Sequence, residues 1–133
     1  YLRGYALPMR PILKTTTLSM ADAEAEIRRS LSEQGFGVLT EIDVAATLLT
    51  KLGIEREPMK ILGACNPTFA HRALQLDADV ALLLPCNVVL EAVDGGTKVS
   101  VADPRDLMDD PSFADLADEA AAELTAAVDA LGG

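Results

Sequence analysis

The sequence predicts an α+β protein in which a curved, largely antiparallel sheet carries its helices on one face. Segments with strand-like alternation and segments with helical periodicity follow one another as strand, helix, strands, helix, strands and helix. An Asp-Gly-Gly turn at 94–96 joins two strands as a hairpin, which makes them antiparallel. Half of the 133 residues are apolar, enough to bury the core of one domain.

The first strand and helix are predicted from β-branched residues and a capping signal. The strand, 12–18, contains three consecutive threonines, which favour an extended backbone. Ser19 then has the character of an N-cap, because its hydroxyl can accept from the first free amides of a helix. That helix presents Ala23 and the apolar residues one turn apart on a single face, and it ends at Gly35. Alternation over 36–43 predicts the next strand.

Two further helices begin at recognisable caps. Asp43 is expected to cap a short helix over 44–52. A strand follows over 59–64, and after it Asn66 and Pro67 combine an N-cap side chain with proline at the first helical position. The chain is therefore expected to return to the sheet between these two helices.

The second half is predicted to complete the sheet and cover it with a last helix. The run 80–84 is apolar throughout, which is typical of a central strand covered on both sides. Segments 88–93 and 97–101 form the two arms of the hairpin. An Asp-Pro cap at 110–111 starts a final helix that extends to residue 131, with acidic residues on its outer face.

The charge of the chain is strongly acidic and unevenly distributed. Eleven basic and 21 acidic residues give a net charge of −10. Residues 1–72 contribute +1, from nine bases and eight acids, and residues 73–133 contribute −11, from two bases and thirteen acids. We interpret this acidity as a solvated outer face, with a surface for a cation or a basic partner as the alternative. Such a charge disfavours nucleic acid and anionic membranes as partners.

Cysteine content and hydropathy predict a reduced, cytoplasmic protein. Two cysteines are too few for a disulfide framework. No apolar run approaches the roughly 18 residues that a membrane span needs. The N-terminal residues also lack the continuous apolar stretch of a signal peptide.

The most specific signal is a pair of dipeptides. The chain has only two cysteines and only two asparagines, and they form Cys65-Asn66 and Cys86-Asn87. Each dipeptide follows a predicted strand. If those two strands are neighbours, both dipeptides lie on one rim of the sheet.

The two thiols are expected to differ in chemistry. Cys65 directly precedes a helix N-terminus, where the helix dipole stabilises a thiolate. Cys86 follows an apolar strand and is expected to be a neutral, packed thiol. Three functional interpretations remain open: a reactive thiol at Cys65, a redox disulfide between the two, or a soft-metal pair completed by a second subunit. The simpler interpretation is that both cysteines pack as small apolar residues while the asparagines cap a helix and a turn.

Three other side chains are weaker candidates. His71 is the only histidine and could serve as a base or ligand, although such a residue is more often on a helix surface. Glu41 and Asp43 share one face of a strand and could form a metal-binding or acid–base pair. The simpler alternative is a solvated Glu41 and a capping Asp43. The sequence contains neither a phosphate-binding glycine loop nor a Ser-His-Asp pattern.

Three sequence blocks resemble the domain-of-unknown-function 302 family: GFGVLTEID at 35–43, KILGACNP at 60–67 and LLPCNV at 83–88. The resemblance implies a TATA-binding-protein-like α+β fold, with a curved antiparallel sheet and helices on one side, and a homodimer. It assigns no activity and no cofactor. We expect residues 1–14 to be an N-terminal lead-in and 15–133 to be one domain of this type.

The function expected from these observations is that of a ligand- or metal-binding module. The sequence does not identify a particular metal or cofactor. The expected site residues are Glu41, Asp43, Cys65, Asn66, Cys86 and Asn87. A thiol-dependent enzyme or redox protein is the first alternative, with Cys65 as the reactive group and His71 as the available base. The second alternative is a structural or interaction protein that acts as a homodimer.

Overall fold

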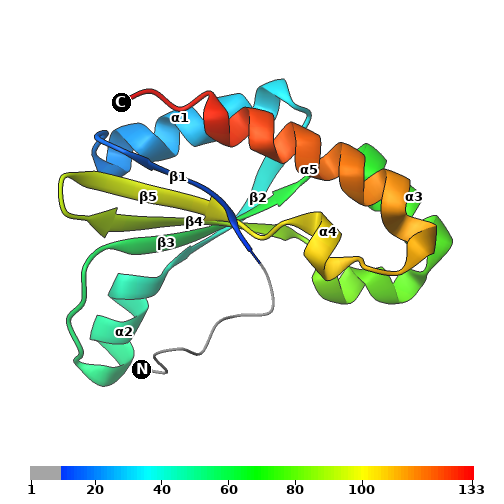
Figure 1. Cartoon of the computed structure of the whole chain (residues 1–133). Coiled ribbons are helices and arrows are strands. Elements are labelled where there is room, and N and C mark those ends of the chain that lie inside the picture. Colours follow the sequence, from blue (N-terminus) through cyan, green and yellow to red (C-terminus); the bar gives the residue numbers. More distant parts are fainter. Residues whose placement is uncertain (1–9) are drawn as a thin grey trace.

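The fold is described by a computed structural model over residues 10–133 (Figure 1). The strands are β1 (Ile12–Thr16), β2 (Gly37–Asp43), β3 (Met59–Cys65), β4 (Cys86–Val93) and β5 (Gly96–Val101). The α-helices are α1 (Met20–Glu33), α2 (Val44–Leu52), α3 (Pro67–Leu76), α4 (Pro104–Leu107) and α5 (Ala114–Asp129). Two 3-10 helices complete the set, η1 (Ala78–Leu83) and η2 (Pro111–Phe113).

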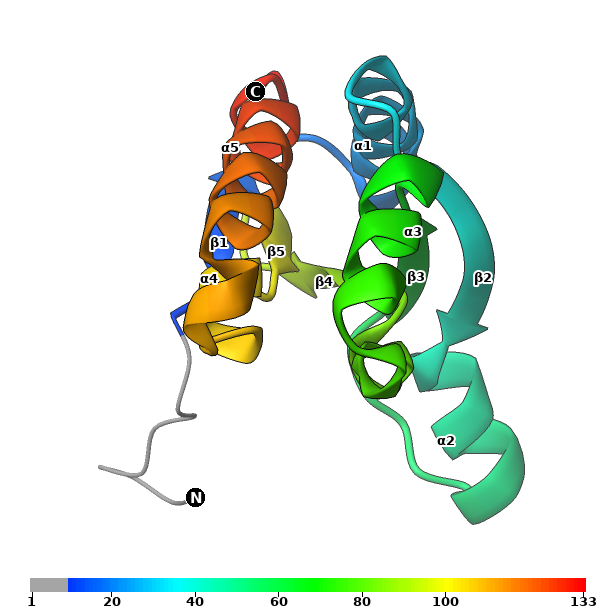
Figure 2. The ribbon, with the colours of Figure 1, turned by 90° about the vertical axis from the view of Figure 1, so that its right-hand side faces the viewer.

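The strands form one sheet in the order β1-β5-β4-β3-β2, and every neighbouring pair is antiparallel. The hairpin between β4 and β5 is formed by the predicted turn, in which Gly95 adopts a positive φ of 82° that favours glycine. Helices α1, α3 and α5 lie on the same side of this twisted sheet (Figures 1 and 2). The predicted α+β class, with its antiparallel sheet and one-sided helices, is therefore confirmed.

The caps of the first three helices form as their residue types predict, whereas the predicted Asp110 cap starts η2, and α5 begins only at Ala114 without a side-chain cap. Ser19 accepts from the Asp22 amide at 3.1 Å, and Asp43 accepts from the Ala46 amide at 2.9 Å. Gly53 ends α2 in the left-handed conformation, with φ of 67°. These local signals place the starts of the first three helices, and the ends of the first two, within a residue or two of the predicted positions.

The main core lies between the sheet and helices α1 and α5. The side chains of the core alternate along β3, β4 and β5, as expected when one sheet face is covered. Its largest fully buried apolar members are Ile27, Leu31, Leu62, Leu90, Leu124, Val88, Val99, Val101 and Val128. A smaller cluster under α3 and the last helix consists of Ala73, Val80, Phe113 and Leu116.

The opposite side of the sheet, which we call the open face, has a different composition. One row crosses all five strands there, because the register pairs Ile42 with Ile61, Ile61 with Val89, Val89 with Ser100, and Ser100 with Leu13. Four of its five side chains are apolar. Ile42 and Leu13, at the two edges, are each 50% exposed.

One predicted strand is wrong. The apolar run 80–84 is not a strand, because its residues belong mainly to the 3-10 helix η1, which Asp77 begins by accepting from the Asp79 amide at 2.9 Å. Val80 packs into the smaller core cluster, whereas Leu82 is 87% exposed. The apolar residues of this run therefore have different environments, one buried and one exposed. The strand that follows the run begins only at Cys86.

The ends of the described chain meet on β1. That strand begins at Ile12, inside the range expected as a lead-in, and residues 1–9 of that range lie outside the described part. The side chains of Lys14 and Thr16 each donate a hydrogen bond to a carbonyl near the C-terminus, at Leu131 and Gly132. Between residues 10 and 133, no helix has the length and apolar character needed to cross a membrane.

Candidate functional site

The two Cys-Asn dipeptides lie at the same end of the sheet, on neighbouring strands. The register pairs Ala64 with Cys86 and Gly63 with Asn87. The expected meeting of the dipeptides therefore occurs, but β4 brings it about rather than a strand at 80–84.

Cys65 and Cys86 line one small apolar void of about 40 Å³, together with Phe36 and Phe69. Both thiols are free and partly buried. Burial raises the pKa of the Cys86 thiol, and the nearby Cys65 raises it further. Cys86 is thus a neutral, packed thiol, as the sequence predicted.

The two asparagines have different environments. Asn66 caps α3, since its Oδ1 accepts from the amides of Thr68 and Phe69 at 3.0 and 3.3 Å. Its Nδ2 also donates to the Gln34 carbonyl at 3.4 Å, which fixes the end of α1 against the start of α3. Asn87 instead has an exposed side chain on the open face. Only the second asparagine is therefore available to a ligand.

Glu41 and Asp43 do not lie beside the cysteines. Strand β2 runs antiparallel to β3, so Gly37 is opposite Cys65 while Asp43 is opposite Lys60, at the other end of β3. Asp43 ends β2 as Cys65 ends β3, but the opposite directions of the two strands place these ends on opposite rims of the sheet. Asp43 is the N-cap of α2, which agrees with the simpler interpretation of that residue.

Glu41 belongs to a closed ring of ion pairs between α1, β2 and β3. Arg28 contacts Glu24 and Glu41 at 2.9 and 2.6 Å. Lys60 contacts the same two carboxylates at 2.9 and 3.2 Å. Burial raises the pKa of Glu24, but hydrogen bonds from Lys60 and Arg28 outweigh it and lower that pKa overall. Hydrogen bonds to Glu24 and Glu41 raise the pKa of Lys60, so the ring favours the charged form of this amine.

His71 lies on the exposed side of α3, whereas Cys65 lines the interior void. No hydrogen bond joins the two within residues 10–133, which gives the proposed base no contact with the proposed thiol. In the same part of the chain, no three His, Cys, Asp or Glu side chains are grouped so as to hold a metal ion.

A groove on the open face begins at the second Cys-Asn dipeptide, and we call it the β4–β5 groove. It has a volume of about 630 Å³. Asn87 and Val89 of β4 and Lys98 and Ser100 of β5 form its floor, because these residues share the open face. The segment from Leu82 to Pro85 lines one wall and Leu107 of α4 another.

Lys98, Ser100 and Leu82 were not among the residues expected from the sequence. Strand β5 did carry a signal, since Lys98 and Ser100 alternate with the buried Val99 and Val101. That alternation predicts a polar face on β5 but not a groove. The wall depends on the path of the chain through η1, which the sequence analysis assigned to a strand.

A five-stranded antiparallel sheet, helices on one face and two Cys-Asn dipeptides at one end define a class of small α+β domain. The family described as domain of unknown function DUF302 matches residues 12–131. The chain belongs to this family, as the three sequence blocks indicated. Its structure is similar to the crystal structure of an uncharacterized conserved DUF302 protein from Bacillus stearothermophilus, with a TM-score of 0.81 and 31% identity over 88% of this chain and 94% of that one. No curated protein matches the chain.

Proposed function

We propose that this protein is a small-molecule-binding module and that its ligand occupies the β4–β5 groove. The observation that carries the proposal is the combination of an apolar wall with polar groups on one floor, next to the Cys86-Asn87 dipeptide. A volume of about 630 Å³ suits a small organic ligand. The sequence analysis expected a ligand- or metal-binding module near both dipeptides. The proposal keeps ligand binding and places it on the open face, beside the second dipeptide only.

The groove favours an apolar ligand with an anionic group. Leu82 is 87% exposed at its wall, and a ligand would remove this side chain from water. Asn87 and Ser100 can donate hydrogen bonds, and Lys98 supplies the positive charge on the floor. A carboxylate attached to a hydrocarbon body combines both requirements.

Lys98 is only weakly engaged within the described chain. Its Nζ lies 3.6 Å from Glu91, and the same carboxylate lies closer to Arg56, at 2.9 Å. Glu91 therefore keeps a partner when Lys98 turns to a ligand. An exposed pair of this kind contributes little to stability, so the exchange costs little.

Octanoate is the first ligand to test, by titration into isotope-labelled protein followed by amide NMR. We expect saturable shifts at Asn87 and Ser100. Lys98→Met should weaken binding about three- to fivefold at low salt, the size of an exposed charge pair. Lys51→Met on α2 is the matched control, since it removes the same charge away from the groove. Equal weakening by both variants, or shifts confined to other elements, would rule out the groove as the site.

The row of apolar residues on the open face favours a second function, homodimerisation. A molecule with a net charge of −10 repels its own copies, but the row itself contains no charged side chain and offers a place for contact. The row crosses all five strands, so a second copy stacked on it would cover Ile42 and Leu13 together.

Sedimentation velocity over a concentration series tests the homodimer. We expect a dimer that Ile42→Lys dissociates, because the substitution places a charge in the row. Leu52→Lys is the control, since Leu52 is 65% exposed on α2 and lies outside the row. A wild-type protein that stays monomeric throughout the series would refute this function.

A thiol-dependent activity and a cytoplasmic location stay predictions, supported by two free cysteines.

A further inference from the structure

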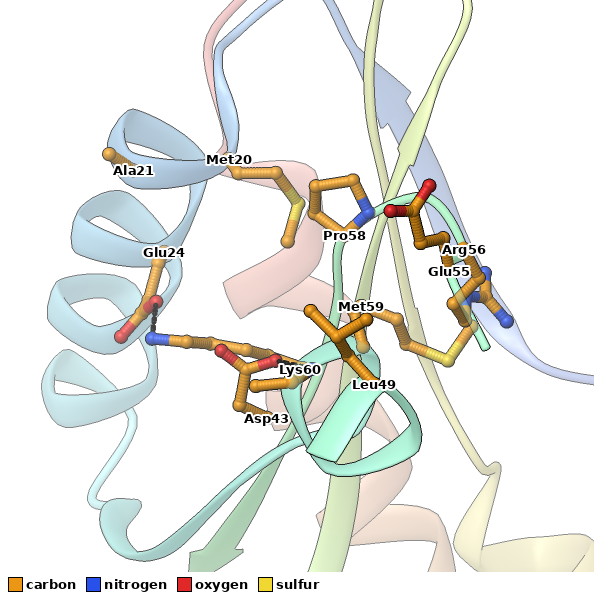
Figure 3. Close-up of a pocket in the computed structure, with 12 residues that line it drawn as sticks. Met20, Ala21, Glu24, Asp43, Leu49, Glu55, Arg56, Pro58, Met59 and Lys60 are labelled. Carbon is orange, nitrogen blue, oxygen red and sulfur yellow. Dashed lines mark hydrogen bonds and ion pairs between the residues drawn. The ribbon is translucent and has the colours of Figure 1, made fainter. Parts of the chain in front are cut away.

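A second cavity lies on the other side of the molecule from the dipeptides, and we call it the α1–α2 cleft. It has a volume of about 600 Å³. Three segments surround it: the first turns of α1, helix α2 with its cap, and the chain that leads into β3. Figure 3 shows Met20, Leu49, Pro58 and Met59 between two groups of charged residues, one at Glu24 and Lys60 and the other at Glu55 and Arg56.

Packing against the rest of the described chain does not explain the apolar sequence of helix α2. Its sequence is mostly apolar, yet none of its residues is buried. Leu49 faces the cleft and remains 52% exposed. Apolar helix faces are normally covered, and two methionines beside Leu49 give the cleft a flexible apolar lining. An apolar ligand in the cleft would cover this lining.

The charged residues that line the cleft indicate which charge a ligand should carry. Both of its bases already have carboxylate partners, since Lys60 contacts Glu24 and Glu41, and Arg56 contacts Glu91. By contrast, Asp43 and Glu55 form no ion pair within residues 10–133. The unneutralised charge of the cleft is therefore negative.

We infer that the α1–α2 cleft binds a small organic cation with an apolar body, such as an alkyl or aryl amine. The hydrocarbon part lies against Met20, Leu49 and Met59, and the ammonium group lies toward the carboxylates. This site is independent of the β4–β5 groove, which lies on other elements and favours the opposite charge. It gives α2 a role that its packing against the sheet does not.

Octylammonium and octanoate form a matched pair of probes, with similar hydrocarbon bodies and opposite charges. We expect octylammonium to shift the amides of Ala21, Ala46 and Leu49 in a saturable way, while octanoate leaves them unchanged. Because the two probes report on different elements, failure of one site leaves the other testable. Equal shifts of these amides by both probes, or no saturable binding of octylammonium, would overturn the inference.

Substitutions on α2 locate the site. Leu49→Gln should weaken octylammonium binding about fivefold, since it removes part of the apolar contact. Leu52→Gln is the control, because Leu52 lies on the same helix but outside the cleft and should leave the affinity unchanged. Asp43→Asn keeps a capping side chain and should weaken binding about twofold. Equal loss in both leucine variants, with folding retained by circular dichroism, would overturn the inference.

Discussion

Gly96→Ala is expected to lower the free energy of unfolding by about 3 kcal/mol, at the upper end for overpacking a folded chain. A Cβ at Gly96 would collide with the Thr16 carbonyl oxygen and lie 2.9 Å from Cα of Thr17. Both are backbone atoms at the end of the adjacent strand β1, so rotating a side chain cannot relieve the contact. The strand must move, and with it the pairing of β1 with β5.

Gly37→Ala is the matched control for this substitution. Gly37 also lies in a strand, but a Cβ there meets nothing within 4 Å. Equilibrium unfolding in guanidinium chloride should show little change for Gly37→Ala and a large loss for Gly96→Ala. Equal effects would mean that both substitutions change stability only through the unfolded state. The close approach of the β1 backbone to Gly96 would then be wrong.

Leu90→Ala is expected to destabilise the protein by about 3 kcal/mol, because it leaves a cavity in the covered face of the sheet. Leu90 is on the central strand β4 and is completely buried. Leu13→Ala removes the same atoms from the open face, where the side chain is 50% exposed, and should cost the monomer about 1 kcal/mol or less.

The comparison of the two leucine variants measures how one-sided the sheet is. It is best carried out by urea unfolding at low protein concentration, where the proposed dimer would dissociate. A cost for Leu13→Ala that grows with protein concentration would support coverage of the open face by a second copy. Equal costs at low concentration would contradict a sheet whose core lies on one side only.

Most of the fold could be predicted because its signals are local. The caps at Ser19, Asp43 and Asn66 work through side chains that reach amides only two or three residues away. The alternation along β4 and β5 likewise reports burial within each strand. Such interactions do not depend on how distant parts of the chain are arranged.

The run 80–84 could not be assigned from its composition. Val80 is apolar because it packs under α3, and Leu82 lies exposed at the groove wall. A short apolar run does not distinguish these causes from a buried strand. The distinction depends on Phe113 and Leu116, more than thirty residues further along, which cover Val80.

The candidate site was predicted in part for a similar reason. The neighbouring positions of the two Cys-Asn dipeptides follow from β3 and β4 being neighbours. Glu41 and Asp43 were expected there as well, but strand direction places Asp43 at the opposite rim. Lys98 and Ser100 could not be assigned to a groove, because its wall is formed by a distant segment through the tertiary fold.

The covered and open faces also separate what substitutions at neighbouring positions can change. Along β4, Val88 and Leu90 are packed under helices, while Asn87 and Val89 point to the open face. Changes at Val88 and Leu90 are expected to alter folding, whereas changes at Asn87 and Val89 are expected to alter the proposed contacts with a ligand or a second copy. Members of the family could therefore acquire different binding preferences on the same scaffold without losing the ability to fold.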